Sequence, residues 1–139
     1  MEPRQQITIK TIAHAPIEKV WDIWVKPEYI QQWNFASADW ACPSAMNDLR
    51  VGGTFNYRME AKDKSFGFDF GGTYTEVVPL SRIAYIIGDG RKVRIDFEKL
   101  DDGVKVTETF EAEDVNSIDK QRLGWQSILD NFTTCVESK

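Results

Sequence analysis

The chain has 139 residues, of which 42% are hydrophobic and 12% aromatic, and its formal net charge is −5. This length and composition indicate one folded domain with a sizeable apolar core, not a disordered chain. The acidic balance argues against nucleic-acid binding, which needs a basic face that displaces phosphate counterions. It also argues against docking on an anionic membrane surface.

Neither a membrane anchor nor a secretion signal is expected. No apolar stretch approaches the roughly 20 residues of a membrane-spanning helix, and no signal peptide precedes the first predicted strand. The two cysteines, Cys42 and Cys135, are far apart and belong to no metal-ligand spacing. This usage is typical of free thiols in a cytoplasmic protein.

The N-terminal part predicts one strand followed by two short helices. Residues 6–13 alternate apolar and polar side chains, which indicates a strand. Pro16 suits the first position of a helix over residues 16–25, because its missing N–H needs no partner there. Pro27 ends that helix and begins a second one, whose apolar side carries Tyr29, Ile30 and Trp33.

The middle of the chain predicts a meander of strands. Residues 34–53 contain Pro43 and a Gly52-Gly53 pair and are expected to be irregular. The segments that follow combine β-favouring composition with period-two alternation, and their short connectors favour antiparallel neighbours. The predicted strands are residues 54–60, 66–78, 82–87, 91–99 and 104–112. Gly71-Gly72 predicts a bulge or bend in the second of these.

Residues 116–138 predict one long amphipathic helix with a polar residue in its apolar stripe. The stripe consists of Ile118, Trp125, Ile128, Leu129, Phe132 and Val136. At about 100° per residue, Gln121 falls inside this stripe. A buried amide without partners costs about 1–3 kcal/mol, so we interpret the helix as the lid of a pocket. Gly124 costs about 1 kcal/mol relative to alanine, for which close approach to a neighbouring element or a bound molecule would compensate.

This order of elements predicts an α+β fold. A curved antiparallel sheet of six or seven strands wraps around the long C-terminal helix, and the two short helices lie between the first and second strands. Only the last helix is long enough to cross the sheet, since ~21 residues span about 30 Å. Residues 1–139 are expected to form this single domain.

Motifs along nearly the whole chain resemble the START-like (SRPBCC) superfamily, which has the helix-grip fold. Within it, the sequence is similar to the AHSA-like family, named for activators of the ATPase of the 90-kDa heat-shock protein. The matching motifs are APIEKVW (15–21), DLRVGGTF (48–55), RMEAKD (58–63), GFDF with GTY (67–74) and QRLGWQSILDNF (121–132). The resemblance implies the fold and a range of roles, since superfamily members bind lipids, hormones and polyketides and a few catalyse cyclisation. The eukaryotic activators carry a further N-terminal domain that contacts the chaperone, whereas this sequence begins at the first strand.

Alternation along the strands gives large aromatic side chains a common inward face. The predicted ligand-binding residues are Trp33, Trp40, Phe55, Tyr57, Met59, Phe68, Phe70, Tyr74, Glu108, Gln121, Trp125 and Ile128. Several aromatic groups with a few convergent polar groups are the usual make-up of a small-molecule site. The alternatives are that the aromatic stripe is solid core, that Gln121 bonds a strand carbonyl, and that a bulge turns Glu108 outward.

Glu108 shares its strand face with Val104, Val106 and Phe110. If its carboxyl is buried without a cationic partner, its pKa rises and the group is protonated near neutrality. It then donates a hydrogen bond, either to Gln121 or to a ligand carbonyl.

The sequence provides no catalytic, metal or cofactor site. It contains no Ser-His-Asp order, no metal-ligand cluster and no phosphate-binding glycine loop. His14, the only histidine, is expected to be solvated or to cap a chain segment. The pairs Asp48/Arg50 and Asp89/Arg91 are expected to fix loops.

The preferred function is non-catalytic binding of a small, mostly apolar molecule, lipid-like or polyketide-like, in a cavity between the sheet and the C-terminal helix. One alternative is a cyclase- or hydrolase-type enzyme that uses Glu108 as acid or base. Another is a protein-interaction module that acts on a chaperone ATPase, as the family name implies. Leu123 lies on the side of the last helix away from the apolar stripe and suits a homodimer contact.

Overall fold

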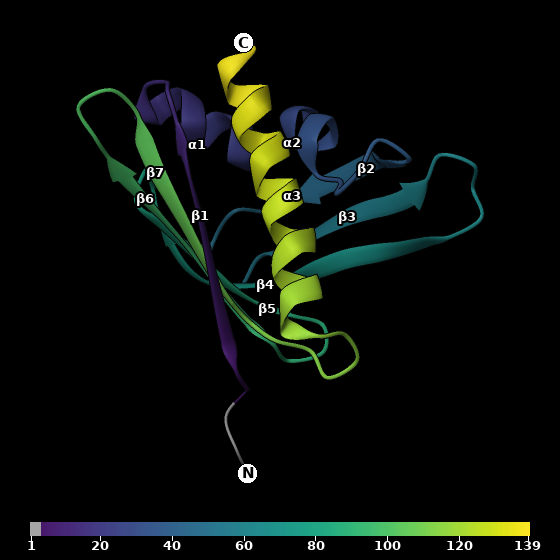
Figure 1. The fold of residues 1–139 in the computed structure, drawn as a ribbon. Coiled ribbons are helices and arrows are strands. Elements are labelled where there is room, and N and C mark those ends of the chain that lie inside the picture. Colours follow the sequence, from purple (N-terminus) through teal and green to yellow (C-terminus); the bar gives the residue numbers. More distant parts are fainter. Residues whose placement is uncertain (1–3) are drawn as a thin grey trace.

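Helix α3 (Ile118–Glu137) lies across the concave face of a curled, seven-stranded antiparallel sheet (Figure 1). This computed structural model describes residues 4–139. The other elements, in chain order, are β1 (Gln6–Ala13), α1 (Ile17–Val25), α2 (Pro27–Trp33), β2 (Trp40–Asn47), β3 (Thr54–Ala61), β4 (Gly67–Val78), β5 (Arg82–Ile87), β6 (Lys92–Lys99) and β7 (Val104–Glu111). The helix-grip α+β fold predicted from the sequence is confirmed.

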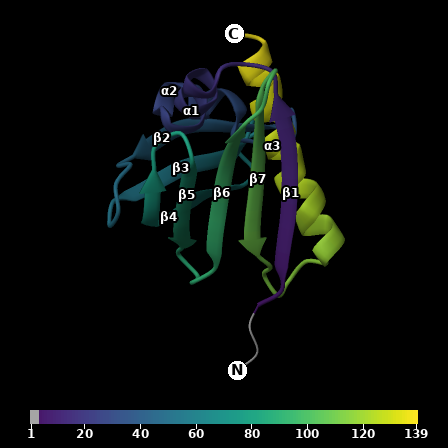
Figure 2. The same ribbon diagram turned by 90° about the vertical axis from the view of Figure 1, so that its left-hand side faces the viewer.

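The sheet order is β1-β7-β6-β5-β4-β3-β2, so a meander runs from β2 to β7 and β1 closes the far edge against β7. The β1–β7 register pairs Gln6 with Glu111 and Ala13 with Val104. Helices α1 and α2 lie at the end of the sheet where α3 finishes (Figure 2). The sheet is therefore covered at that end by three helices and at the other end by α3 alone.

The helix starts follow the expected chemistry. The side chain of Ser117 caps α3 by accepting a hydrogen bond from the backbone N–H of Lys120 at 3.1 Å. Pro27 occupies the first turn of α2, as expected. Pro16 precedes α1 as its cap residue, one position earlier than predicted.

The prediction that residues 34–53 are irregular was wrong, because this segment contains the edge strand β2. The strand pairs with β3, and its register shifts between Ala41 and Ser44, around Pro43. A proline lacks the N–H needed for a continuous ladder and is tolerated at an edge or bulge. The shift also breaks the period-two pattern that identifies the other strands.

The expected bulge at Gly71-Gly72 was also misplaced. Both glycines pair in regular register with β3, and the irregularity in β4 lies between Tyr74 and Glu76. A Cβ at Gly71 would lie 2.7 Å from the carbonyl oxygen of Phe55, and one at Gly72 would lie 2.5 Å from that of Ile86. The glycines therefore permit close approach of both neighbouring strands in this part of the sheet.

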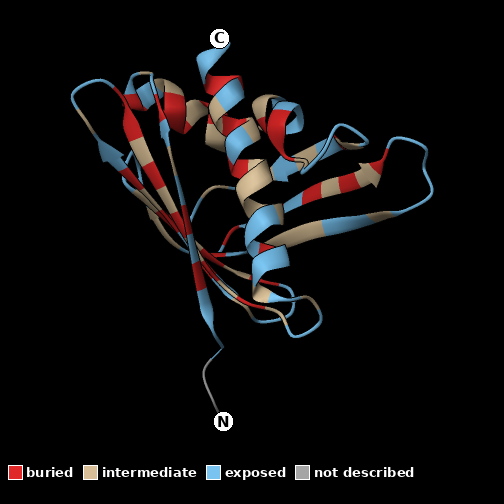
Figure 3. Ribbon diagram, in the orientation of Figure 1, coloured by how far each residue is buried: buried red, intermediate tan, exposed pale blue. Residues whose placement is uncertain are grey.

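Burial alternates along β1, β3, β5, β6 and β7 (Figure 3), as expected for a sheet with one covered face. At the end covered by three helices, Phe132 of α3 packs edge-to-face on Trp24 and Trp33, with ring centroids 4.8 and 5.0 Å away. Phe97 of β6 lies 5.7 Å from Trp24 on the sheet side. This aromatic cluster fills the interior and anchors the C-terminal half of α3.

Replacing Phe132, which is fully buried, tests this anchor. Phe132→Ala should lower the free energy of unfolding by about 3–5 kcal/mol, because it leaves a cavity beside the rings of Trp24 and Trp33. Urea denaturation measures the change. Leu123→Ala on the same helix is the control, since Leu123 is 70% exposed and its loss should change stability by less than about 0.5 kcal/mol. Equal effects of the two substitutions would contradict the assignment of the anchor.

Candidate functional site

A pocket of about 370 Å³ lies between the concave face of the sheet and the N-terminal half of α3. Its walls come from the helices α1, α2 and α3, from the strands β3, β4, β5 and β7, and from the α2–β2, β5–β6 and β7–α3 connections. The lining residues are Trp24, Trp33, Asn34, Tyr57, Met59, Phe68, Phe70, Tyr74, Ile83, Tyr85, Arg91, Glu108, Glu113, Asn116, Lys120, Gln121, Gly124, Trp125, Ile128 and Leu129. Most of this wall is apolar or aromatic.

The space exists because α3 is buried unevenly along its length. Its C-terminal half buries Leu129, Phe132, Cys135 and Val136, whereas Gln121 is the buried residue of its N-terminal half (Figure 3). The indole of Trp125 fills part of the space between this half of α3 and strand β7 and forms one wall of the pocket.

Trp125 stacks flat on Phe110 of β7, with centroids 3.9 Å apart and planes 8° apart. The edge of Phe70 from β4 approaches the same indole at 6.1 Å. Two stacked rings between helix and strand hold this half of α3 away from the sheet, since aromatic rings are large and rigid. The pocket therefore lies beside the stacked rings of Trp125 and Phe110.

Most of the predicted ligand-binding residues line this one pocket. They are Trp33, Tyr57, Met59, Phe68, Phe70, Tyr74, Glu108, Gln121, Trp125 and Ile128. Their contact with a ligand stays a prediction, but their convergence on one space is a property of the fold.

Trp40 and Phe55 do not line the pocket. Trp40 is the first residue of the edge strand β2 and packs on Phe66 and Phe68, at 6.0 and 5.9 Å, outside the mouth. Phe55 points inward as predicted, but it is buried behind the rings of Tyr57, Tyr74 and Tyr85. The strand period gives the face of a residue but not its depth behind neighbours.

Several lining residues were missed. Tyr85 alternates with Ile83 and Ile87 in β5, so the period-two pattern would have placed it inward. Arg91, Glu113 and Asn116 come from chain connections, and Lys120 from the first turn of α3. Connections have no period, so the sequence held no comparable signal for the residues at this rim.

Glu108 lies on the concave face, which settles the strand face that the sequence left open. Its register partners are Ile9 on β1 and Ile95 on β6, and it is only 6% exposed. No hydrogen bond or ion pair reaches its carboxyl group from residues 4–139. Burial alone raises the pKa of this carboxyl from 4.5 to about 8. The group is therefore mostly protonated at neutral pH.

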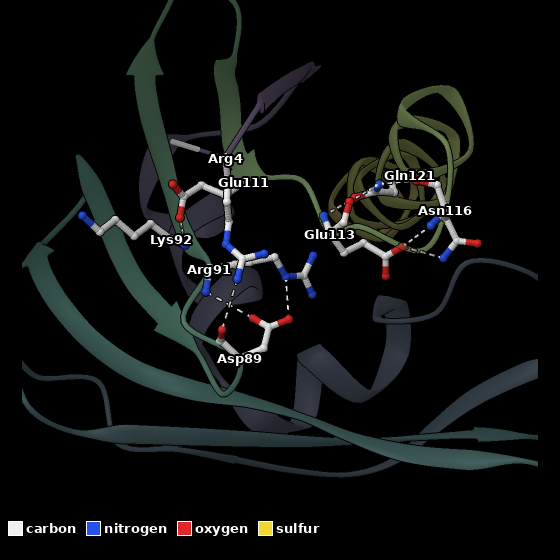
Figure 4. Close-up of polar contacts among 8 residues, drawn as sticks. All are labelled: Arg4, Asp89, Arg91, Lys92, Glu111, Glu113, Asn116 and Gln121. Carbon is white, nitrogen blue, oxygen red and sulfur yellow. Dashed lines mark hydrogen bonds and ion pairs between the residues drawn. The ribbon is translucent and has the colours of Figure 1, made fainter. Parts of the chain in front are cut away.

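Gln121 is buried, and its amide is used by the connection between β7 and α3 (Figure 4). Its Oε1 accepts a hydrogen bond from the N–H of Glu113 at 2.9 Å. Its Nε2 donates to the carbonyl oxygens of Glu113 and Asn116 at 3.2 and 2.8 Å. The partner is a loop backbone and not the strand carbonyl considered from the sequence. Gln121 therefore fixes one wall of the pocket.

The rim carries charged groups that are partly paired. Arg91 donates through Nε to Asp89 at 2.8 Å, and its side chain extends from the β5–β6 turn toward the segment of Glu113 (Figure 4). The Oε1 atom of Glu113 accepts hydrogen bonds from the backbone and side chain of Asn116, at 2.6 and 2.7 Å. The Asp89–Arg91 pair fixes its turn, as predicted.

The remaining sequence candidates serve structural contacts. His14 donates its backbone N–H to Glu137 at 2.9 Å, and its ring Nδ1 lies 2.9 Å from the same oxygen, which ties the β1–α1 junction to the end of α3. Arg50 pairs with Asp48 at 2.9 Å. The homodimer contact through the exposed Leu123 stays a prediction.

Both cysteines are buried free thiols, and burial raises the pKa of each. A raised pKa lowers the fraction of the nucleophilic thiolate. Residues 4–139 contain no cluster of three or more potential metal ligands among His, Cys, Asp and Glu. No helix in that range is both long and apolar enough to cross a bilayer.

Comparison with known proteins identifies relatives over almost the whole chain. The family model described as "Activator of Hsp90 ATPase homolog 1-like protein" matches residues 14–137. The solution structure of an AHSA1-like protein from Aeromonas hydrophila is 43% identical, with a TM-score of 0.92 over 96% of this chain and 93% of that one. Protein Chr148 from Cytophaga hutchinsonii is 46% identical, with a TM-score of 0.83 over 96% and 92%. No functionally curated protein matches the chain.

The buried carboxyl predicts an unusual pH dependence of stability. Between pH 4.5 and about 8 the folded protein retains a proton on Glu108 that the unfolded chain has lost. The contribution of Glu108 to the free energy of unfolding therefore falls as pH rises through this range, by on the order of 4–5 kcal/mol.

Glu108→Gln removes this titration, so its stability relative to the parent should increase steadily from pH 5 to pH 8. Urea denaturation across the pH series measures the difference. Glu98→Gln on β6 is the control, because Glu98 is exposed and forms no ion pair with residues 4–139. Parallel pH profiles for Glu108→Gln and the parent protein would refute the buried, protonated state.

Proposed function

Given that this chain belongs to the family of activator of Hsp90 ATPase homolog 1-like proteins, we propose that it binds a small, mostly apolar molecule without catalysing a reaction. The expected ligand is lipid-like or polyketide-like in polarity and occupies the pocket under the N-terminal half of α3. The free, buried thiols support the cytoplasm as the compartment.

The observation that carries the proposal is the pocket itself. Its volume of about 370 Å³ falls in the range of small-molecule sites, which is roughly 300–1,000 Å³. Its wall combines aromatic rings with a few polar groups, the composition expected for such sites. A well-packed interior leaves few voids larger than a water molecule, so a space of this size is a departure that a bound molecule explains.

Gly124 gives independent support. A glycine in the middle of a helix costs about 1 kcal/mol relative to alanine. Gly124 lines the pocket, and a Cβ added to it would meet no atom within 4 Å. Close packing against another element therefore does not explain this glycine. A ligand that passes close to the helix backbone would.

Two other functions receive less support. An enzyme that uses Glu108 as acid or base needs a second proton-transfer group or a nucleophile beside it. Burial is the sole cause of the raised pKa of Glu108, so no charged partner acts on it among residues 4–139. Action on a chaperone ATPase rests on the family's name. We therefore propose binding.

Purified protein should show the ligand directly. Native mass spectrometry is expected to detect a retained small molecule, or a mass shift when apolar candidates are added. A ligand present at a hundred times its Kd should raise the free energy of unfolding by about 2.7 kcal/mol, because it binds the folded state alone. The absence of any adduct or thermal shift across a broad lipid and polyketide panel would argue against the proposed function.

Filling the pocket should abolish binding. Gly124→Leu places a side chain into open space, so we expect a folded protein with helix content and stability at least equal to the parent. Any adduct seen with the parent protein should disappear. Arg122→Leu adds the same side chain to the exposed face of α3 and is the matched control. Undiminished binding by Gly124→Leu would place the ligand elsewhere.

A further inference from the structure

Two side chains that carry hydroxyl groups line the pocket without a hydrogen-bond partner. They are Glu108 on β7 and Tyr85 on β5. No hydrogen bond within residues 4–139 uses either the carboxyl of Glu108 or the phenol of Tyr85. By contrast, the hydroxyl of Tyr74 in the same pocket donates to Oδ1 of Asn47, and the phenol of Tyr57 is hydrogen-bonded to that of Tyr74.

Their polar atoms remain accessible from the pocket. Both residues are buried, with exposed fractions of 6% and 7%. Among the described residues, every side-chain nitrogen or oxygen that is fully inaccessible to solvent has a hydrogen-bond partner. The unpartnered oxygens of Glu108 and Tyr85 are therefore not sealed in the protein, and the space that both residues line is the pocket.

The sheet register places the two groups on neighbouring rows of the concave face. Glu108 on β7 pairs with Ile95 on β6, and Ile95 pairs in turn with Ile83 on β5. Tyr85 is the next inward residue on β5 after Ile83. Burial raises the pKa of Tyr85 well above its usual value, and the nearby Glu108 carboxyl adds to this rise. Both groups therefore keep their protons at neutral pH and both can donate.

The interior selects one kind of ligand atom. A carbonyl oxygen has two lone pairs and can accept from both O–H groups at once. An anionic group would find no cation in the interior formed by residues 4–139, because the two cations that line the pocket, Arg91 and Lys120, both lie at its rim. Arg91 is already paired with Asp89, and Lys120 is exposed to solvent. An ammonium group would require ionised Glu108, which burial among Ile9, Ile95 and Phe110 opposes.

We propose that the ligand is an apolar molecule with a carbonyl group, whose oxygen lies between the carboxyl O–H of Glu108 and the phenol O–H of Tyr85. This inference rests on the proposed function and names the ligand class of the same pocket. The aromatic wall holds the apolar body, and the two donors fix its orientation. The same two donors select a ketone over a hydrocarbon of equal shape.

Three probes with one carbon skeleton test this selection: acetophenone, ethylbenzene and 1-phenylethylamine. Protein NMR titration of the full chain gives the Kd of each at pH 7. The quantity compared between the parent protein and each variant is the ratio of the ethylbenzene Kd to the acetophenone Kd. The hydration free energy of each free probe is the same for all proteins, so it cancels in this comparison. Tyr85→Phe and Glu108→Leu should each lower this ratio about tenfold, the value of one hydrogen bond.

Two substitutions make the test specific. Glu108→Gln keeps an N–H donor at the same place and should preserve most of the ratio. If Glu108 had only a structural role, Glu108→Gln and Glu108→Leu should give the same ratio. Tyr29→Phe removes a phenol oxygen on α2 outside the pocket and should leave the ratio unchanged. Far-ultraviolet circular dichroism verifies that each variant is folded.

The pH dependence gives a second measurement. The ratio for the parent protein should fall as pH rises through about 8, since ionised Glu108 no longer donates, whereas the ratio for Glu108→Gln should stay constant. The other titratable groups that line the pocket are Tyr57, Tyr74, Tyr85, Arg91, Glu113 and Lys120. All of them are shared by the parent and the variant, so the difference isolates Glu108.

The outcomes separate this inference from the proposed function. If all probes bind but Tyr85→Phe and Glu108→Leu leave the ratio unchanged, the carbonyl inference fails and apolar binding stands. Tighter binding of the amine than of the ketone would also overturn it, in favour of an ionised Glu108. If none of the probes binds, the proposed function and the inference fall together.

Discussion

The uneven seating of α3 on the sheet determines the rest of this structure. Its C-terminal half is fixed by Phe132 between Trp24 and Trp33, where three helices and the sheet meet. Its N-terminal half is supported by the stack of Trp125 on Phe110 and by the hydrogen bonds of Gln121 to the preceding loop. A helix that is held firmly at both ends but packs closely at only one leaves room beneath the other.

Two residues that line the pocket lower the stability of the folded protein. Glu108 sits between Ile9 and Ile95, where a leucine or valine would stabilise the fold, and burial forces its carboxyl to remain protonated at neutral pH. Gly124, which lines the same pocket, weakens the helix by about 1 kcal/mol relative to alanine. Both costs fall on residues that face one space, as expected where local stability is sacrificed for a site.

The sequence predicts the features that follow from a regular period. The helical angle places Gln121 among apolar residues, and the strand period places Glu108 on the same face as Val106 and Phe110; the structure shows both side chains buried. The partners of Gln121 were beyond such reasoning, because they are backbone groups of a loop. The edge strand β2 was missed because Pro43 and the register shift beside it interrupt the alternation.

The limits at the pocket have equally physical causes. Phe55 and Tyr57 share a strand face, but Phe55 is covered by other rings and only Tyr57 reaches the space. The rim residues Arg91 and Glu113 lie in connections, whose course depends on tertiary contacts. The sequence therefore predicted most of the side chains that line the pocket, but neither which of them are covered by other rings nor which residues form the rim.

The central claim is that a guest molecule fits between the sheet and the N-terminal half of α3. Isotope-filtered NMR on the protein with a bound unlabelled apolar probe tests it most directly. The account predicts intermolecular nuclear Overhauser effects from one probe to Tyr57 on the sheet and to both Gly124 and Trp125 on the helix. Contacts confined to Trp40 and Phe66, outside the mouth, would contradict it.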